Sequence, residues 1–340
     1  MPLELIENAD LKPLNTFGVE ARARFLARIS SANDLAQLSA EPRTKDLPRT
    51  VLGGGSNILL TGNVEGVVAK IDVAGLNEIG ETDDAWLVEI GAGENWHDAV
   101  RRLLAKQRPG LENLALIPGQ AGAAPIQNIG AYGVELAERF HSLRAWDTAT
   151  SLVVTMKLAD CNFGYRDSVF KREPTGDRIV LSVTLALPKR WIPVTSYADV
   201  GNELRAHGIK KPAPLDIFNA VVAIRRRKLP DPATIGNAGS FFKNPVVSRA
   251  KQLELIGRFP SLVSYALPGG RFKLAAGWLI EACGLKGATR GRAGVYERQA
   301  LVLVNRGGAT GREILALARE VQEKVAEKFG VRLEPEPVIV

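Results

Sequence analysis

The chain has 340 residues, of which 46% are hydrophobic and 24% are charged. This composition is typical of a globular protein of two or three domains and excludes a disordered or fibrous chain. The net charge of +7 favours anionic partners. No apolar run reaches the ~18 residues of a transmembrane helix, and the acidic N-terminus lacks the apolar core of a signal peptide. We therefore expect a cytoplasmic protein with no membrane partner.

The cysteine, histidine and basic residues further limit the compartment, the metal sites and the partners that we expect for this protein. Cys161 and Cys283 are far apart and belong to no CxxC motif, which fits a reducing compartment and argues against structural zinc. The three histidines form no ligand pair, so no metal site is expected. The densest basic cluster, residues 225–228, is short, and no zinc-finger or RNA-recognition pattern occurs. A phosphate-bearing small molecule therefore explains the charge better than nucleic acid, which we do not expect as a partner.

Strands and helices alternate along the first part of the chain, which indicates an α/β or α+β arrangement. Short apolar segments suited to strands lie at 24–29, 50–60 and 66–72, with a helical pattern at 32–40. Residues 86–93 predict a strand. The next helix, over 95–107, has an apolar face of Trp96, Val100, Leu103 and Leu104. A hairpin is expected over 143–161 and an alternating strand over 177–190.

The last third predicts further helices over 216–232, where prolines end the helix and a domain boundary is plausible, and over 273–287, before a glycine stop. A buried strand follows at 300–305. Thr310 and Glu313 form a capping box, and the helix that it opens has an apolar face of Ile314, Leu317, Val321 and Val325. The proline-containing C-terminus is expected to be extended.

Two glycine-rich stretches are candidates for ligand binding. Gly53–Asn57 follows a short strand, and its three glycines allow the exposed backbone N–H groups of a phosphate nest; a simple tight turn is the alternative. Residues 117–133 have no helical or strand period, and an irregular stretch of this length in a compact domain is usually functional. Together the two loops can clasp a pyrophosphate, with Ile117, Pro118 and Ile126 against a flat ring system.

Three further stretches carry reactive side chains. Ser240, in GNAGSFFKNP, lacks a GxSxG elbow, an SxxK motif and a neighbouring histidine, so a nucleophilic role is unsupported. A turn or cap serine and a proton donor remain as alternatives. Arg166, in GYRDS, either stabilises an oxyanion or forms a surface salt bridge with Asp167. For Glu334 and Glu336, in LEPEP, either one carboxylate is buried against a substrate, where it acts as an acid or orients a water, or both are solvated.

Eight stretches in this order resemble one family, the UDP-N-acetylenolpyruvoylglucosamine reductases (UDP-N-acetylmuramate dehydrogenases) of peptidoglycan synthesis. They are NTFGVEARA, VLGGGSNILL, IPGQAGAAPIQNIGAYG, GYRDSVFK, KLPDPATIGNAGSFFKNPVV, AAGWLIEACGLKG, QALVLVN and LEPEP. The resemblance implies an α+β, vanillyl-alcohol-oxidase-type FAD-binding fold with a third, α/β substrate domain. The implied divisions are 1–70 with 331–340, 71–225 and 226–330. It also implies a monomer.

By this resemblance, NADPH reduces FAD, and the flavin passes hydride to C3 of UDP-N-acetylglucosamine enolpyruvate, which yields UDP-N-acetylmuramate. Ser240 matches the family's proton donor to C2, while Arg166 and Glu336 match the residues that stabilise the enolate. Pro337 departs from the family's usual ending and leaves Glu334 as an alternative; we take Glu336, the second glutamate of the motif.

The resemblance also implies binding residues. Tyr197 matches a substrate-stacking tyrosine of the longer subclass, and the other substrate residues are Lys228, Asn244 and Gln299. The implied FAD residues are Gly53, Gly54, Gly55, Ser56, Asn57, Ile117, Pro118, Gly119, Gly122, Ala123, Gln127, Asn128, Gly130, Ala131, Tyr132 and Tyr165. Two other functions stay open: an FAD-dependent oxidase or dehydrogenase of the same fold acting on a small alcohol or sugar, and a non-enzymatic nucleic-acid module. The matches at Ser240, Lys228 and Tyr197 disfavour the former.

Overall fold

The computed structural model describes residues 3–172 and 176–340, which form two compact units. The first unit comprises the chain up to Ala9, Arg22–Gly55 and Val64–Arg227. The second comprises Asp10–Ala21, Ser56–Asn63 and Lys228–Val340. The chain therefore passes between the units several times before residue 64.

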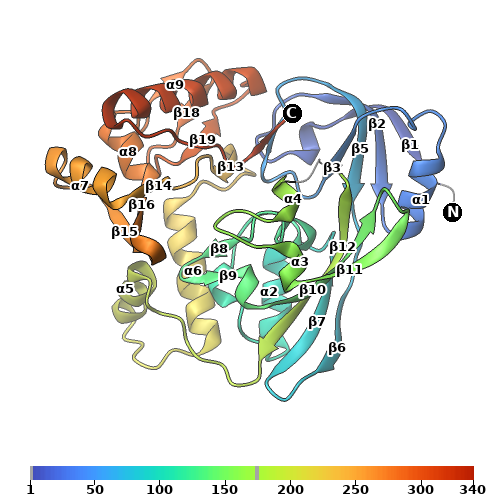
Figure 1. Ribbon diagram of the computed structural model, residues 1–340, viewed down its shortest axis with the longest axis horizontal. Helices are drawn as coiled ribbons and strands as arrows, with labels where there is room; N and C mark the ends of the chain where they lie inside the picture. Colours follow the sequence, from blue (N-terminus) through green and yellow to red (C-terminus); the bar gives the residue numbers. More distant parts are fainter. Residues whose placement is uncertain (1–2, 173–175) are drawn as a thin grey trace. The chain divides into compact units, whose positions relative to one another are not determined.

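The first unit begins with a four-stranded sheet of order β1-β2-β5-β3 (Figure 1). Its strands are β1 (Leu5–Asp10), β2 (Arg22–Ile29), β3 (Arg49–Leu52) and β5 (Val64–Ile71). Both β2 and β3 run parallel to the buried strand β5. Parallel neighbours need a crossover connection, and helix α1 (Ala32–Ala40), which packs on β2, lies in the connection from β2 to β3. The strands expected at 24–29 and 66–72 and the helix expected at 32–40 are confirmed, whereas the segment 50–60 is divided by a glycine turn into β3 and β4 (Ile58–Leu59).

A second, antiparallel sheet of the first unit has the order β11-β10-β12-β7-β6. Its strands are β6 (Leu76–Glu81), β7 (Ala85–Gly91), β10 (Phe140–Asp147), β11 (Leu152–Lys157) and β12 (Arg178–Pro188). The expected hairpin is confirmed, because β10 pairs with β11 from Ser142 opposite Lys157 to Asp147 opposite Leu152. The expected alternation in β12 is wrong: residues 179–185 are all buried, because this central strand is covered on both faces.

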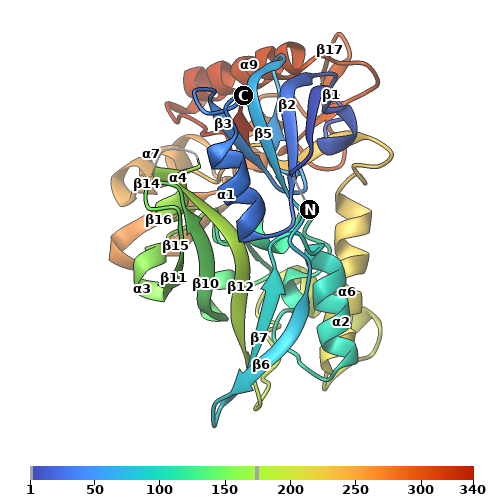
Figure 2. The same ribbon diagram turned by 90° about the vertical axis from the view of Figure 1, so that its right-hand side faces the viewer.

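Two longer helices of the first unit, α2 (Trp96–Ala105) and α6 (Pro214–Lys228), lie side by side (Figure 2). The ring of His97 on α2 stacks on that of Phe218 on α6, with centroids 5.4 Å apart. Shorter elements complete the unit: α3 (Leu158–Cys161), α4 (Val169–Arg172), α5 (Ala198–Ala206), β8 (Gly130–Ala131) and β9 (Val134–Glu135). Apart from β8 and a short 3₁₀ turn, residues 117–133 have no regular structure, as expected.

The second unit contains the antiparallel sheet β13-β19-β18-β17, against which helix α9 packs (Figure 1). Its strands are β13 (Gly236–Ser240), β17 (Thr289–Arg290), β18 (Ala293–Val295) and β19 (Val302–Asn305). A smaller sheet, β14-β16-β15, consists of β14 (Val246–Ser248), β15 (Ser264–Leu267) and β16 (Arg271–Leu274), followed by α8 (Ala276–Ala282), and α7 (Arg249–Arg258) adjoins it. Near the C-terminus, β20 (Val338–Ile339) pairs in parallel with β4 (Ile58–Leu59).

Helix α9 (Gly311–Phe329) has the expected start and the expected buried face. Thr310 caps it: Thr310 Oγ1 accepts the N–H of Glu313, and the Glu313 carboxylate accepts the N–H of Thr310 in return. The helix expected over 273–287 is too long at both ends. It starts at Ala276 because residues up to Leu274 pair as strand β16, and it stops at Ala282, just before Gly284 turns into the left-handed region at φ +73°.

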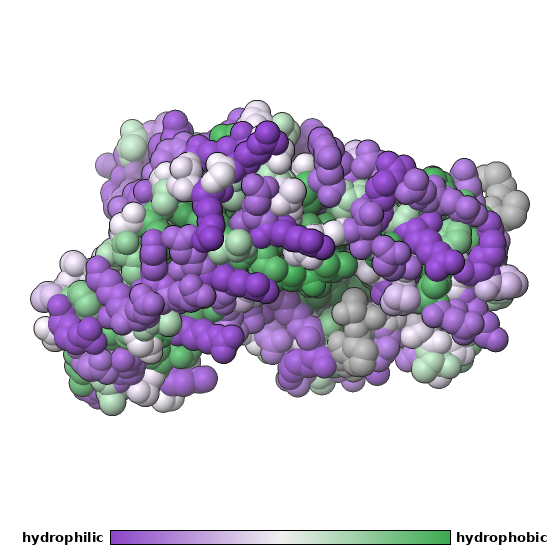
Figure 3. Space-filling model, turned by 90° about the horizontal axis from the view of Figure 1, so that it is seen from above, coloured by the Kyte–Doolittle hydropathy of each residue, from purple (hydrophilic) through white to green (hydrophobic). Residues whose placement is uncertain are grey.

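Figure 3 shows one face of the molecule, on which hydrophilic residues predominate and hydrophobic residues form smaller patches. Within residues 3–172 and 176–340, no helix is both long and apolar enough to cross a membrane.

Candidate active site

The two glycine-rich loops of the first unit pass close to each other. A Cβ atom placed on Gly54 would lie 3.0 Å from Cα of Gly119, and one on Gly53 would lie 3.4 Å from Oε1 of Gln120. The loops follow different elements: Gly53 comes directly after β3, whereas Gly119 and Gln120 belong to the irregular segment 117–133, which lies after helix α2 along the chain. Glycine is needed at position 54 because the two backbones leave no room for a side chain.

The segment around Gly119 is also held by the loop that precedes α2. The carbonyl of Gly119 accepts the N–H of Trp96 at 3.0 Å, and the N–H of Gly122 donates to the carbonyl of Ala92 at 3.0 Å. A Cβ atom on Gly122 would lie 2.5 Å from Cβ of Ala92. The backbone of 119–122 is therefore fixed in place before any ligand binds.

A pocket of the first unit opens between these loops and strand β12. Small and apolar residues dominate its lining, which consists of Val51, Gly53, Ile71, Ala92, Gly122, Ala123, Ile126, Phe170, Gly176, Arg178, Ile179 and Val180. Four of these, Gly53, Gly122, Ala123 and Ile126, were expected to contact a cofactor. Small residues beside branched aliphatic ones suit a flat, largely apolar ring system, and Arg178 adds a positive charge.

Asn128 and Ser168 join the GYRDS stretch to the end of the irregular segment. The buried side chain of Asn128 donates to the carboxylate of Glu135 at 2.9 Å and to the carbonyl of Gly164 at 3.1 Å. Its own Oδ1 accepts the N–H of Ala137 at 3.0 Å. Ser168 Oγ, also buried, donates to the carbonyl of Ile126 at 2.6 Å. Asn128 thus supports the loop through contacts within the protein.

Arg166 is half-buried against the same segment. Its guanidinium donates to the carbonyls of Asn128, at 3.4 Å, and Gly130, and it lies 5.4 Å from the ring centroid of Tyr165. A Cβ atom on Gly130 would lie only 2.9 Å from Arg166 Nη1, so glycine makes room for the guanidinium. Asp167 forms an ion pair with Arg172 at 3.2 Å.

Tyr132 contacts both Arg225 and the exposed Tyr197. Arg225, on α6, hydrogen-bonds the Tyr132 hydroxyl and also donates to the carbonyl of Leu116 at 3.1 Å. Burial raises the pKa of Tyr132, and the charge of Arg225 opposes that rise. The ring of Tyr197, 43% exposed, meets Tyr132 edge-on with centroids 5.3 Å apart. Asn113 donates to the carbonyls of Tyr132 and Val194. These two bonds connect the residues just before Tyr197 to the irregular segment 117–133.

Ser240 ends strand β13 in the second unit, directly after a bulge. The pairing of β13 with β19 shifts register between Asn237 and Ser240, and Gly239 within the bulge has φ +68°. A bulge re-aims the side chain that follows it. Ser240 is half-buried, and among the described residues Ser240 Oγ makes no hydrogen bond, so the hydroxyl is available to a ligand. These contacts do not support the turn- or cap-serine interpretation.

The C-terminal LEPEP stretch runs alongside the residues that follow Ser240. Glu336 donates its N–H to the carbonyl of Phe241 at 2.8 Å, and Lys243 donates its N–H to the carbonyl of Glu334 at 2.9 Å. The Glu334 side chain is 72% exposed and pairs with Lys243 Nζ at 3.5 Å, whereas Glu336 is half-buried. Asn57 Nδ2 donates to the carbonyl of Glu336 at 3.3 Å, which places the end of GGGSN beside this glutamate.

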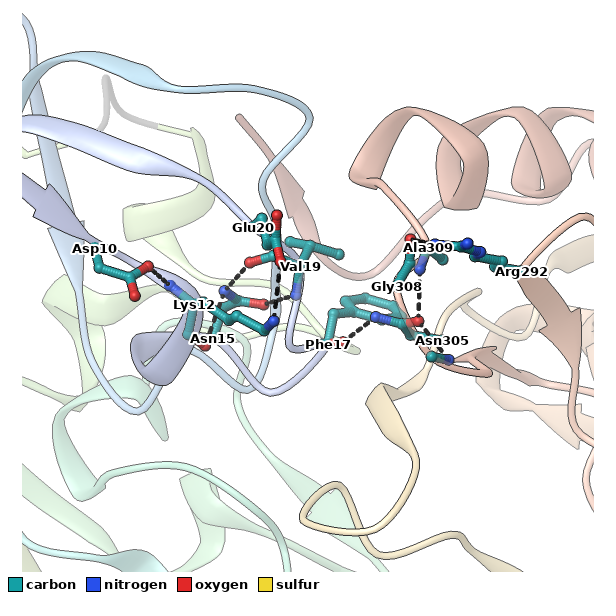
Figure 4. Close-up of polar contacts among 11 residues, drawn as sticks. Asp10, Lys12, Asn15, Phe17, Val19, Glu20, Arg292, Asn305, Gly308 and Ala309 are labelled. Atoms are coloured by element: carbon teal, nitrogen blue, oxygen red, sulfur yellow. Dashed lines mark hydrogen bonds and ion pairs between the residues drawn. The ribbon is translucent and has the colours of Figure 1, made fainter.

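The NTFG stretch near the N-terminus supports β13, a role that sequence reasoning did not assign to it. Asn305 on β19 donates to the carbonyl of Phe17 at 2.9 Å, and Asn15 closes the turn between Leu11 and Val19 (Figure 4). A Cβ atom on Gly236 would lie 2.1 Å from the carbonyl oxygen of Phe17. The signal was present in the sequence as a polar turn of the type Asn-Thr-Phe-Gly, but its partner lies more than 200 residues away.

The expected substrate residues of the second unit lie on its loops and helix ends. Lys228 is the last residue of α6, and Asn244 Oδ1 accepts the N–H of Ala276 at the start of α8. Gln299 Oε1 accepts the N–H of Leu301 and lies 2.9 Å from where a Cβ atom of Gly277 would be. Asn244 and Gln299 therefore both adjoin the first turn of α8.

The remaining expected cofactor residues differ in exposure. Gly55 is buried; Pro118 and Ala123 are exposed. The half-buried ones are Ser56, Ile117, Gln127, Ala131 and Tyr165.

An α+β unit with two close glycine loops beside an apolar pocket is the arrangement of an FAD-binding protein, and residues 23–157 match the model of an FAD binding domain. The chain thus has an α+β FAD-binding fold, as expected. Residues 231–340 match the model of the C-terminal domain of UDP-N-acetylenolpyruvoylglucosamine reductase.

Whole-chain comparisons agree. The chain is 55% identical to a UDP-N-acetylenolpyruvoylglucosamine reductase of Ralstonia nicotianae, over 96% of each chain. It is 56% identical to one of Burkholderia ambifaria, over 99% of this chain and 97% of that one. The crystal structure of the reductase from Thermus caldophilus is similar with a TM-score of 0.68 and 26% identity, over 99% of this chain and 98% of that one. The chain belongs to the UDP-N-acetylenolpyruvoylglucosamine reductase family and is an FAD-dependent oxidoreductase. Family membership implies a UDP-sugar substrate and a nicotinamide co-substrate.

Proposed function

We propose that this chain reduces UDP-N-acetylglucosamine enolpyruvate to UDP-N-acetylmuramate with NADPH, as a step of peptidoglycan precursor synthesis. The observation that carries the proposal is the near-complete coverage at 55–56% identity by reductases of that name. The local structure around Ser240 and Glu336 supports it. The bulge re-aims the side chain of Ser240, and the backbone N–H of Glu336 binds the carbonyl of Phe241, the residue that follows Ser240.

The glycine loops and pocket of the first unit fit FAD. Close backbone approach at Gly54 leaves main-chain groups, rather than side chains, to face a pyrophosphate, and the lining beside Gly122 and Ile126 suits a flat ring. We propose that these residues, with the others expected from the family motifs, hold the cofactor. When bound, FAD accepts a hydride from NADPH and supplies it to C3 of the enolpyruvyl group.

Ser240 is the proposed proton donor. Addition of hydride to C3 turns the C2–C3 double bond into a single bond and leaves an electron pair at C2, which takes the proton of Ser240 Oγ. Reprotonation of the serine restores the enzyme. A serine that only donates a proton to carbon needs no adjacent base to form an alkoxide.

Arg166 and Glu336 are proposed to stabilise the enolate that precedes protonation. The donors are the Arg166 guanidinium and the O–H of a protonated Glu336, and each donor aimed at such an oxyanion lowers the barrier by about 3 kcal/mol. Glu336 fits this role better than Glu334, because Glu334 is exposed and paired with Lys243, whereas Glu336 is half-buried and its backbone binds next to Ser240.

The nucleotide and sugar are proposed to bind Tyr197, Lys228, Asn244 and Gln299. The ring of Tyr197 is 43% exposed and meets Tyr132 edge-on, and an aromatic ring at the surface supports a stacking role. We expect Tyr197→Ala, which removes the ring, to weaken substrate binding and leave flavin reduction by NADPH unchanged. Equal dissociation constants for the nucleotide in wild type and variant would contradict this assignment.

The finer organisation is also proposed. We infer two FAD subdomains, 1–70 with 331–340 and 71–225, a substrate domain over 226–330, a monomeric state and a cytoplasmic location. These rest on membership of the family.

Stopped-flow measurement of the two half-reactions tests the proposed function. With wild type, NADPH should bleach the flavin, and anaerobic addition of UDP-N-acetylglucosamine enolpyruvate should restore its colour. Ser240→Ala should leave the bleaching intact and slow the recovery by at least about 100-fold, the usual size of an acid–base contribution. Equal slowing of both half-reactions would refute the assignment of Ser240, and rapid recovery with oxygen but none with the nucleotide would favour an oxidase of the same fold.

A further inference from the structure

One charged residue, Lys70, is buried in strand β5, whose other buried residues are apolar or glycine. Lys70 is 6% exposed, and its neighbours Val67, Val68, Ala69 and Ile71 are buried as well. In the parallel pairing of β3 with β5, Lys70 is opposite Leu52, the residue directly before Gly53. An ammonium group at such a position costs free energy unless each of its protons finds an acceptor.

Lys70 Nζ has three acceptors. It donates to Asp72 Oδ1 at 2.7 Å, to the carbonyl of Ile71 at 3.2 Å and to Gln120 Oε1 at 3.2 Å. Asp72 is held from its other side by Arg28 at 2.6 Å. Burial raises the pKa of Asp72, but the hydrogen bonds and charges of Lys70 and Arg28 outweigh burial and lower it below its usual value. The carboxylate is therefore a fixed anchor for Lys70.

Gln120 connects Lys70 to the glycine loops. Its Nε2 donates to the carbonyl of Gly93 at 2.8 Å, and its backbone pairs with Asn95. Its Oε1, the atom that Lys70 binds, is the atom nearest to a Cβ placed on Gly53. Lys70 thus lies opposite the end of β3, the strand before one glycine loop, and binds Gln120, a residue of the other loop.

We propose that Lys70 is a positioning residue for the cofactor loops, acting through Gln120 to hold residues 119–122 against Gly53 and Gly54. The inference rests on the proposed role of these loops in binding FAD. Lys70 itself donates its protons to protein acceptors, so it shapes the site without touching the cofactor. Loss of the lysine removes the bond that holds Oε1 of Gln120 beside Gly53 and leaves the bond of its Nε2 to Gly93, so the loops lose part of their order before binding.

The test measures the dissociation constant of FAD by fluorescence of the released flavin, with the unfolding temperature of the apoprotein measured in parallel. Lys70→Met keeps the length and apolar stem of the side chain. We expect it to raise the FAD dissociation constant about tenfold, the factor that one charge-assisted hydrogen bond is worth. The matched control is Arg28→Met, which removes the other cation of Asp72 but touches neither loop, and it should change the constant less than about twofold.

A double-mutant cycle separates positioning from a general loss of stability. Gln120→Leu should weaken FAD binding alone, and adding Lys70→Met to it should weaken binding no further. An unchanged FAD dissociation constant in Lys70→Met, additive effects in the cycle, or an equal effect of Arg28→Met would overturn the proposal. If Lys70→Met fails to fold, Gln120→Leu decides, since unaltered FAD binding there contradicts the inference.

One more variant distinguishes an error in the role of Lys70 from an error in the assignment of the loops to FAD. Gly54→Val places a side chain against the backbone of Gly119 and should abolish FAD binding if the loops hold the cofactor. Loss of binding in Gly54→Val with none in Lys70→Met refutes the role of Lys70 alone. Normal binding in Gly54→Val refutes the loop assignment, and the inference with it.

Discussion

Asn237 offers a sharp test of what holds Ser240 in place. It is 2% exposed, and its side chain closes the bulge of β13 from within. Nδ2 donates to the carbonyls of Ile235 at 2.8 Å and Pro230 at 3.3 Å, and Oδ1 accepts the N–H of Gly239 at 2.9 Å. The amide therefore satisfies three backbone groups at once, one of them on the residue directly before Ser240.

The magnitude follows from these three bonds. Each buried hydrogen bond contributes about 1 kcal/mol net, so Asn237→Ala should lower the free energy of unfolding by about 3 kcal/mol. In a domain of this size, 1 kcal/mol corresponds to about 2–4 °C, so the unfolding temperature should fall by roughly 6–12 °C. Asn237→Asp keeps the acceptor for Gly239 but sets a carboxylate against two carbonyl oxygens, and we expect it to be at least as destabilising near neutral pH.

Thermal and urea unfolding of the variant proteins measure this cost, and Asn202→Ala is the control. Asn202 is exposed, and its side chain binds one partner, Arg205, so its loss should cost no more than about 0.5 kcal/mol. A cost below about 1 kcal/mol for Asn237→Ala would refute the view that this amide organises the bulge. Hydrogen exchange at Gly239 should speed up in the variant even at temperatures where the protein stays folded.

Three further outcomes are expected. Gly236→Ala should destabilise by about 2 kcal/mol or more, because its methyl group meets the carbonyl of Phe17, whereas Gly62→Ala, with open space around it, should not; equal unfolding temperatures would contradict this. Thr310→Ala should cost about 1 kcal/mol in urea unfolding through loss of the α9 capping box, and no change would show that the cap contributes nothing. Burial raises the pKa of the Cys161 thiol to about 12, so the reactive thiolate is scarce until strongly alkaline pH. A thiol reagent at pH 8 should therefore modify the half-exposed Cys283 first, and prompt modification of Cys161 in the folded protein would disprove it.

Local patterns in the sequence were sufficient for most elements. The apolar face of α9 and its capping box at Thr310 were predicted correctly, because helix period and cap chemistry depend on residues within one or two turns. The hairpin of β10 and β11 was predicted for the same reason. The start of α8 was not, since pairing of Arg271–Leu274 with β15 outweighs a helical pattern that is equally good on local grounds.

For the candidate site, the sequence determined which chemical groups are available, and the motif order determined the family. It did not determine how distant groups meet. Glu334 and Glu336 are indistinguishable in LEPEP by local chemistry, and only their backbone bonds to Lys243 and Phe241 separate an exposed carboxylate from a half-buried one. Lys70 and Gln120 lie 50 positions apart, and no local pattern in the sequence indicates that they interact. Tertiary structure decided both matters, because burial and hydrogen bonding between remote segments arise only when the strands that carry them are paired.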